Sequence, residues 1–323
     1  MSLMLILRYY VKNKFLTYSK IYQKKNKTQI IIATHSEVIL DEAVENNLSC
    51  IVDGKIIDFS SKQDAKVTLK ELGIQHYYNA LVTHRLLITE GSSDVDALRA
   101  FATKLNHPVK DLLDSRLFTL YIKDSTNNDT DGSITRQLET IGIDYRKYFQ
   151  ILKKLDPELK AIAIRDGDGT CHPIDRSQKD LEIVYWDKYE IENYFITPEL
   201  LIEYVKKEIG LHEGELFAIS EKCGIDISNS MDETIAHFLF GGDLNRVKEY
   251  YDSSPKEKEK LLSNIKMSEF ANKFFCNLSR KRQSPILLNK GEYYQLIDLL
   301  PNNEIPKGII ETLDHVYSTL KID

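Results

Sequence analysis

Short apolar runs alternate with helical stretches through the middle of the chain. Apolar residues at helical spacing follow the first run at residues 95–101, with Ser92, Ser93 or Asp94 as the expected cap, and a further helix is predicted from about Ser133. The runs themselves, each of strand length, are 85–89 (RLLIT), 117–122, 161–164 (AIAI) and 181–185. Because strands joined by helical crossovers lie parallel in one sheet, this order predicts an α/β fold with a mainly parallel sheet flanked by helices.

The segments on either side have different patterns. Residues 3–25 are apolar at helical spacing, residues 29–33 are predicted as a buried strand, and alternation around Asp53-Gly54 predicts a hairpin over 50–59. Residues 60–84 are polar and form an expected connector, whereas the chain from Pro198 onward is helical and charged. We therefore expect an N-terminal part of residues 1–79, an α/β domain of residues 80–197 and a helical C-terminal region of residues 198–323.

Composition and charge narrow the class of protein. The chain has 323 residues, of which 42% are apolar and 28% charged, and its net charge is −6. These values are typical of a globular protein, and the acidic balance argues against binding nucleic acid through bulk positive charge. A local basic groove, or metal ions that reverse the local sign, stay open. The four scattered cysteines indicate neither a disulfide framework nor a zinc finger. Since no signal peptide or membrane-spanning run is evident, we expect a cytoplasmic protein with no membrane partner.

Acidic residues follow the first strand of the predicted sheet. Glu90 comes directly after RLLIT, and Asp94 lies at the start of the next helix. Because ligands bind outside the carboxyl ends of the strands in open α/β sheets, both acids are placed at the expected rim. The alternative for Asp94 is a plain helix cap.

A second acidic pair follows the AIAI strand. Asp166 and Asp168 are two residues apart, so in an extended segment both carboxylates face the same way. Two like charges held together repel unless a cation lies between them, which favours a divalent metal. The alternative is an exposed Asp-Gly turn.

Glu190 and Glu192 alternate with apolar residues just beyond the last strand. If this segment is extended, the two glutamates share a face and complete an oxygen-rich site; the alternative is a pair of solvated surface acids. Carboxylates after three successive strands suit Mg²⁺ or Mn²⁺ better than zinc, and we expect them to bind two such ions.

The acidic pattern resembles a known domain. Glu90-Gly91 after a strand, Asp94, and Asp166-x-Asp168 after a later strand are similar to the TOPRIM domain, a Rossmann-like domain of topoisomerases, primases and related nucleases. Upstream, QIIIATHSEVIL resembles the last strand and switch-histidine loop of ABC-type ATPases. This order resembles the overcoming-lysogenization-defect (OLD) family of ATPase–TOPRIM nucleases, as does the tail KGEYYQLIDLLPNNEIPKGIIETLD. The segment YEIENYF is also similar to TOPRIM-only nucleases that are paired with separate ATPases in phage defence.

The N-terminal part departs from a complete ATPase. The chain has no glycine-rich phosphate loop ending in Lys-Ser or Lys-Thr, and no acidic Walker B strand precedes His35. We therefore expect residues 1–79 to be the C-terminal piece of an ABC-type ATPase domain, either cut from a longer protein or a natural remnant, without ATP hydrolysis of its own. His35 would then be only the remnant of a nucleotide-binding residue, and a structural hydrogen bond is its expected role.

The resemblance implies a metal-dependent endonuclease that cleaves phosphodiester bonds, in phage defence or DNA processing, with DNA favoured over RNA. In this scheme Glu90 and Asp94, with help from Glu192, bind one metal, and Asp166 and Asp168 hold the second or bridge the two, with Glu190 and Asp124 as further ligands. Contacts with the nucleic-acid backbone are expected from Lys290 and from the basic cluster Arg280, Lys281 and Arg282. A partner ATPase and a homodimer are compatible with the scheme. The alternatives are an RNA-cleaving TOPRIM nuclease acting on tRNA, strand passage with a tyrosine nucleophile, and a non-catalytic interaction module.

Overall fold

The computed structural model describes residues 21–22, 24–28, 31, 49–52, 55–58, 79–80, 82–115, 117–122, 145–167, 179–210 and 217–321. The chain divides into two compact units, one of Met1–His84 with Ile141–Leu159 and one of Arg85–Thr140 with Lys160–Asp323. The boundary expected between residues 197 and 198 lies inside the second unit, which we call unit 2.

The first unit holds the predicted hairpin. Strands β1 (Ser49–Val52) and β2 (Lys55–Asp58) pair antiparallel, with Val52 opposite Lys55. Helix α7 (Tyr145–Leu155) belongs to this unit, and the buried Asp156 behind it accepts a hydrogen bond from His84 at 2.9 Å. Of the helix predicted over 3–25, the described residues 21–22 and 24–25 are helical. The strand predicted at 29–33, apart from Ile31, and the loop with His35 lie outside the described residues.

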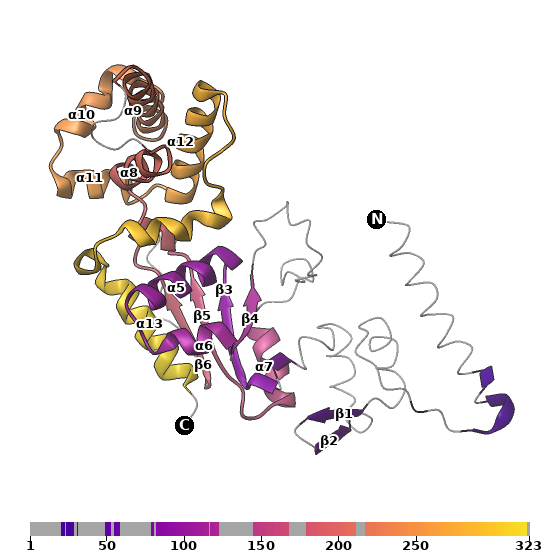
Figure 1. The fold of residues 1–323 in the computed structure, drawn as a ribbon. Helices are drawn as coiled ribbons and strands as arrows, with labels where there is room; N and C mark the ends of the chain where they lie inside the picture. The colour runs from indigo at the N-terminus through magenta and orange to yellow at the C-terminus, as the bar shows by residue number, and fades with distance from the viewer. Residues whose placement is uncertain are drawn as a thin grey trace. The chain divides into compact units, whose positions relative to one another are not determined.

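Unit 2 is built on a four-stranded parallel sheet in the order β4-β3-β5-β6 (Figure 1). Its strands are β3 (Arg85–Thr89), β4 (Phe118–Tyr121), β5 (Lys160–Arg165) and β6 (Leu181–Tyr185). The predicted α/β class and parallel sheet are therefore confirmed. The central strands β3 and β5 are almost wholly buried, whereas β4 and β6 alternate between buried and partly exposed positions. This explains why RLLIT and AIAI are continuous apolar runs, as expected for parallel strands covered on both faces.

Three helices lie against one face of this sheet (Figure 1). Helices α5 (Ser92–Lys104) and α6 (Val109–Ser115) connect β3 to β4, and α13 (Lys307–Leu320) at the C-terminus packs on β5, α5 and α6. The guanidinium of Arg85 donates hydrogen bonds to the carbonyls of Leu320 and Lys321 at 2.9 and 3.3 Å, which fastens the end of α13 to the start of β3. Helix α6 was not among the predicted elements.

The remaining helices form the predicted helical region, and it shares one core with the sheet. Helix α12 (Met267–Arg282) packs on α9 (Phe217–Leu239) (Figure 1). The 3₁₀ segment η3 (Lys290–Leu299) returns the chain to α5. Leu87 and Ile164 of the sheet, Phe270 of α12 and Leu313 of α13 all belong to a single buried apolar cluster. The helical elements are α8 (Pro198–Glu208), α9 (Phe217–Leu239), η2 (Leu244–Arg246), α10 (Val247–Asp252), α11 (Pro255–Leu262), α12 (Met267–Arg282), η3 (Lys290–Leu299) and η4 (Asn302–Glu304).

Candidate functional site

The sheet has a topological switch point between β3 and β5. From β3 the chain crosses to β4 on one side, and its next strand, β5, lies on the other side of β3. In open α/β sheets, ligands bind outside the carboxyl ends of the strands at such a point. Glu90 follows β3 and Asp166 follows β5, so the two acids flank the switch point directly.

Glu90 and Asp94 are both buried, with 7% of each residue exposed. The carboxylate of Glu90 accepts a hydrogen bond from Nε of Arg165, the last residue of β5, which ties the ends of the two central strands together. The helix cap was predicted one to three residues too late, because Gly91 is the N-cap of α5. Asp94 lies in the first turn and accepts a hydrogen bond from the Gly91 N–H at 3.1 Å. This is the hydrogen bond that an N3 acid makes in a capping box, so Asp94 takes part in capping α5, as the alternative expected, and also faces the strand end.

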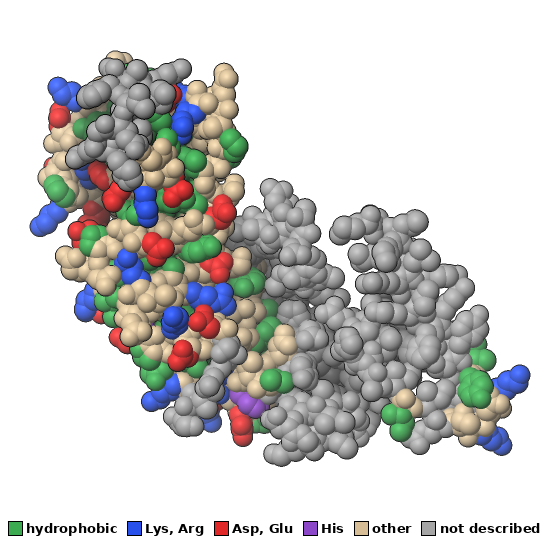
Figure 2. All heavy atoms as spheres, viewed as in Figure 1, with side chains coloured by type: hydrophobic (Ala, Val, Ile, Leu, Met, Phe, Trp, Pro, Cys, Tyr) green, Lys and Arg blue, Asp and Glu red, His purple; other side chains and the backbone are tan. Residues whose placement is uncertain are grey.

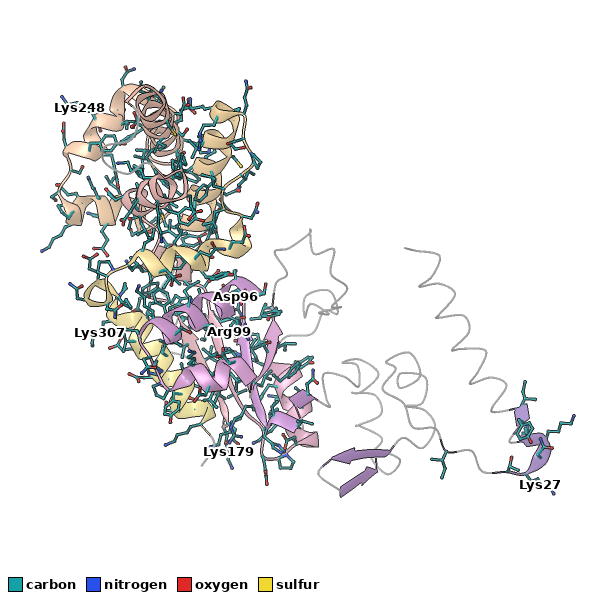
Figure 3. All side chains as sticks on the ribbon, in the orientation of Figure 1. Lys27, Asp96, Arg99, Lys179, Lys248 and Lys307 are labelled. Atoms are coloured by element: carbon teal, nitrogen blue, oxygen red, sulfur yellow. The ribbon has the colours of Figure 1, made fainter. Side chains whose placement is uncertain are left out.

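The solvent side of α5 carries a different acid. Asp96 pairs with Arg99 at 3.1 Å, and both side chains are about two-fifths exposed (Figure 3). Asp94 lies only two positions earlier but on the buried side of the helix. The contrast shows that the burial of Asp94 is a property of its place at the strand end.

A close backbone approach brings the segment after β6 over the end of β5. A Cβ atom added to Gly167 would lie 2.2 Å from the carbonyl oxygen of Lys188 and 2.4 Å from that of Trp186. Only glycine allows this approach without displacing the chain. The same segment leads on to Glu190, and so the contact at Gly167 sets where that glutamate lies.

Glu190 and Glu192 are buried, with 4% and 5% of each residue exposed, so they are not solvated surface acids. The extended conformation considered for them is wrong for Glu192: Glu190 is extended, but Ile191–Tyr194 form the 3₁₀ helix η1. Ser268, in the first turn of α12, donates to the Glu190 carboxylate from its N–H at 2.6 Å and from its Oγ at 3.1 Å. A carboxylate at a helix N-terminus is favoured by the helix dipole.

These acids form one electrostatic group. We call it the carboxylate cluster: Glu90, Asp94, Asp166, Glu190 and Glu192. Burial, followed by repulsion from Asp94, Glu90 and Glu190, raises the pKa of Asp166 to about 8. Burial, followed by the carboxylate charges of Glu90 and Glu190, raises the pKa of Asp94 to about 6. Hydrogen bonds from the backbone of Gly91 and of Glu90 oppose this shift. The pKa of Glu192 is raised well above its ordinary value by burial, then by Glu190 and Asp94. The acids of three strand ends therefore lie close enough to repel one another.

Two lysines from the helical region face this cluster. The ammonium groups of Lys290, at the start of η3, and of Lys266, the N-cap of α12, lower the pKa of Glu190 and so oppose the effect of its burial. Tyr293, one turn after Lys290, is 2% exposed and its hydroxyl has no hydrogen-bond partner among the described residues. Lys290 was predicted as a site residue, whereas Lys266, Ser268 and Arg165 were not.

The basic cluster Arg280-Lys281-Arg282 lies elsewhere. It occupies the last turn of α12, a helix of 16 residues, whereas Ser268 and its bond to Glu190 are in the first turn. At 1.5 Å per residue the two ends are roughly 24 Å apart. Lys281 pairs with Glu233 of α9 at 2.7 Å, and positive charges at a helix C-terminus are favoured by the helix dipole. The structure therefore does not bring these three residues to the carboxylate cluster.

The donor set of the cluster suits a hard divalent cation, since carboxylate oxygens are the ligands that Mg²⁺ and Mn²⁺ prefer. Among the described residues, however, no group of three or more His, Cys, Asp or Glu side chains already has the geometry of a metal site. Asp168 and Asp124, two of the predicted ligands, lie outside the part of the chain that the structure describes. The fit therefore rests on the chemistry and repulsion of the carboxylates rather than on a preformed coordination shell.

Charges on the visible surface of unit 2 are mixed in sign. Lys and Arg side chains are interspersed with Asp and Glu over the face shown in Figure 2, without a continuous basic area on that face. No helix among the described residues combines the length and apolar composition needed to cross a membrane. Comparisons with models of protein families, with curated proteins and with solved structures find no significant match.

Proposed function

We propose that unit 2 is a metal-dependent nuclease domain of the TOPRIM type, which hydrolyses phosphodiester bonds in nucleic acid. One observation carries the proposal: carboxylates from the ends of β3 and β5 and from the segment after β6, all buried except the partly exposed Asp166, lie at the switch point. Burial and then neighbouring carboxylates raise the pKa of Asp94, Asp166 and Glu192 there. Sites of chemistry are where burial and like charges are arranged to shift pKa values in this way. In a purely structural role, burying like charges together would destabilise the fold with no opposite charge to compensate them.

A divalent cation is the simplest partner for this arrangement. Glu90, Asp94 and Asp166 would hold it from the switch point, with Glu190 and Glu192 on the side of the helical region; Asp168 and Asp124 are further ligands that we propose from the sequence. When bound, one or two Mg²⁺ or Mn²⁺ ions supply an activated water and neutralise the phosphate. No protein nucleophile is then needed.

The chain's own residues position this chemistry. Arg165 fixes one oxygen of Glu90, and Ser268 fixes both oxygens of Glu190. Hydrogen-bond partners of this kind orient metal ligands and raise their affinity for the ion. Burial of Glu90, Asp94, Glu190 and Glu192 limits their contact with bulk water and strengthens the charge interactions among them.

We propose membership of the OLD family or of the related TOPRIM-only nucleases, an ATPase-derived N-terminal part that includes His35, and action together with an ATPase partner in phage defence. DNA is the favoured substrate, and a homodimer is the proposed assembly. Arg280, Lys281 and Arg282 would then contact nucleic acid only beyond the cleavage site, because they lie at the far end of α12.

The test is cleavage of supercoiled plasmid, linear DNA and structured RNA with Mg²⁺, Mn²⁺ or EDTA. We expect nicking with either metal, none with EDTA, and a loss of more than about a hundredfold in Glu90→Gln and Asp166→Asn, since even outer partners of a metal site contribute up to that factor. Glu203→Gln on the exposed side of α8 is the matched control and should cleave normally. Absence of metal-dependent cleavage, or full activity in both variants, would refute the proposal.

A further inference from the structure

Lys266 is held at the carboxylate cluster by contacts on both of its sides. The carbonyl of Ile265, the residue before it, accepts a hydrogen bond from Nδ2 of Asn193 at 2.8 Å. Ser268, two residues after it, donates twice to Glu190. Asn193 and Glu190 belong to the same η1 region, so residues 265–268 are clamped along it. The backbone of Lys266 therefore has one defined position beside the cluster.

The side chain of Lys266 points along the same segment. Its Nζ lies 5.7 Å from the centre of the Tyr189 ring, within the range of a cation–π contact. Its charge also acts on Asp166 and Glu190, which places the ammonium near carboxylates from both the β5 end and the segment after β6. Lys266 and Asp166 are both partly exposed, whereas Glu190 is buried.

A phosphodiester that approaches the cluster meets a field of negative charge. A fixed cation at the rim offsets this repulsion and orients the incoming anion, as charges placed around a binding site generally do. We propose that Lys266 contacts a backbone phosphate of the nucleic acid at the carboxylate cluster. The inference rests on the proposed nuclease function, because it names how that site receives its substrate.

Binding, rather than cleavage, tests this role. Fluorescence anisotropy of a labelled DNA duplex and a labelled RNA hairpin is measured in Ca²⁺ over a series of salt concentrations, with wild type, Lys266→Gln, Lys266→Arg and Lys248→Gln. Lys248 on α10 is an exposed lysine (Figure 3), and its substitution changes the net charge by the same amount.

We expect Lys266→Gln to weaken binding about tenfold, the contribution of a hydrogen bond to a charged group. The slope of log affinity against log salt concentration should become shallower by about one, the contribution of one phosphate contact. Lys266→Arg should keep both the affinity and this slope close to those of wild type. Lys248→Gln should behave as wild type. The affinity for Mn²⁺ without nucleic acid should be unchanged or higher in Lys266→Gln, since removing a cation does not weaken the binding of another. Comparing the affinities for the DNA duplex and the RNA hairpin identifies which nucleic acid the site binds.

The inference is overturned if Lys266→Gln binds as wild type, if it loses Mn²⁺ binding, or if wild type binds neither nucleic acid. Failure of the nuclease proposal looks different: wild type then binds nucleic acid through Lys266 but cleaves none with Mg²⁺ or Mn²⁺. Cleavage by wild type together with unchanged binding by Lys266→Gln would remove the lysine's role alone.

Discussion

At the scale of single residues, Asp166 and Asp94 are the acids whose protonation depends most clearly on their surroundings. The pKa of Asp166 is raised from 3.8 to about 8 and that of Asp94 from 3.8 to about 6, in both cases chiefly by burial and then by neighbouring carboxylates. Each of them is therefore easier to ionise in the unfolded chain than in the folded one. The carboxylate cluster is a source of instability at neutral pH unless a cation compensates it.

This predicts how metal-free stability depends on pH. Because the folded pKa values lie above the unfolded ones, the folded state binds more protons between about pH 4 and 8, and its stability falls as pH rises through about 6 and then about 8. In EDTA, the free energy of unfolding measured with urea should therefore decrease from about pH 5 to about pH 8.5. Mn²⁺ at the higher pH should restore it.

Asp166→Asn is the matched variant for this prediction. It should be more stable than wild type in EDTA at about pH 8, should show a shallower dependence on pH, and should gain less from Mn²⁺. Asp252→Asn, at the exposed end of α10, should keep the wild-type dependence. A wild-type protein whose stability rises over this window would show that the cluster is not repulsive in solution.

At the scale of elements, the positions of the site's acids depend more on the segments that follow the strands than on the strands themselves. Glu90 and Asp166 could be placed from sequence, because each is the first residue after a strand whose short apolar run is typical of a central strand covered on both faces. The helical turn at Glu192 could not, because the alternation in YEIENYF is equally typical of an extended segment. The cap at Gly91 was missed because glycine has no side chain to identify it, while three better cap residues follow.

Gly167→Ala tests the crossing of the segment after β6 over β5. A methyl group there overlaps the carbonyls of Lys188 and Trp186, which are backbone atoms with little freedom to move. We expect a loss of about 3 kcal/mol in unfolding free energy, the upper part of the range for overpacking, together with weaker Mn²⁺ binding as Glu190 is displaced.

Gly224→Ala is the control, since nothing lies within 4 Å of the added carbon and the residue is inside α9. It should be neutral or stabilising by up to about 1 kcal/mol, the difference in helix propensity. Urea unfolding and calorimetric titration with Mn²⁺ measure both effects. Equal stability of the two variants would mean that the segment does not approach Gly167 so closely.

At the scale of the whole molecule, unit 2 joins residues that are far apart along the chain. Ser268 and Lys266 could not be predicted as site residues, because nothing in their local sequence shows that α12 begins against Glu190. Only the packing of the helical region on the sheet creates that contact. The return of α13 to β5 likewise depends on a single shared core, so we expect the sheet and the helical region to unfold together.

Leu313→Ala tests this cooperativity. Leu313 is fully buried on α13, and its truncation should cost about 2–5 kcal/mol. The single tryptophan, Trp186, lies just after β6 and reports on the sheet side by fluorescence, while circular dichroism reports on the helices. Both signals should shift to lower urea together. Ile310→Ala, a 37% exposed position on the same helix, should shift them much less. Two separated transitions would contradict the shared core.

The most direct measurement of the central claim is the anomalous scattering of manganese in crystals grown with Mn²⁺. We predict a peak at the switch point, bounded by Glu90, Asp94 and Asp166, that disappears in crystals of Asp166→Asn grown under the same conditions. No peak among these carboxylates, or a peak that persists unchanged in the variant, would show that the carboxylate cluster is not a metal site and would remove the basis of the proposed nuclease.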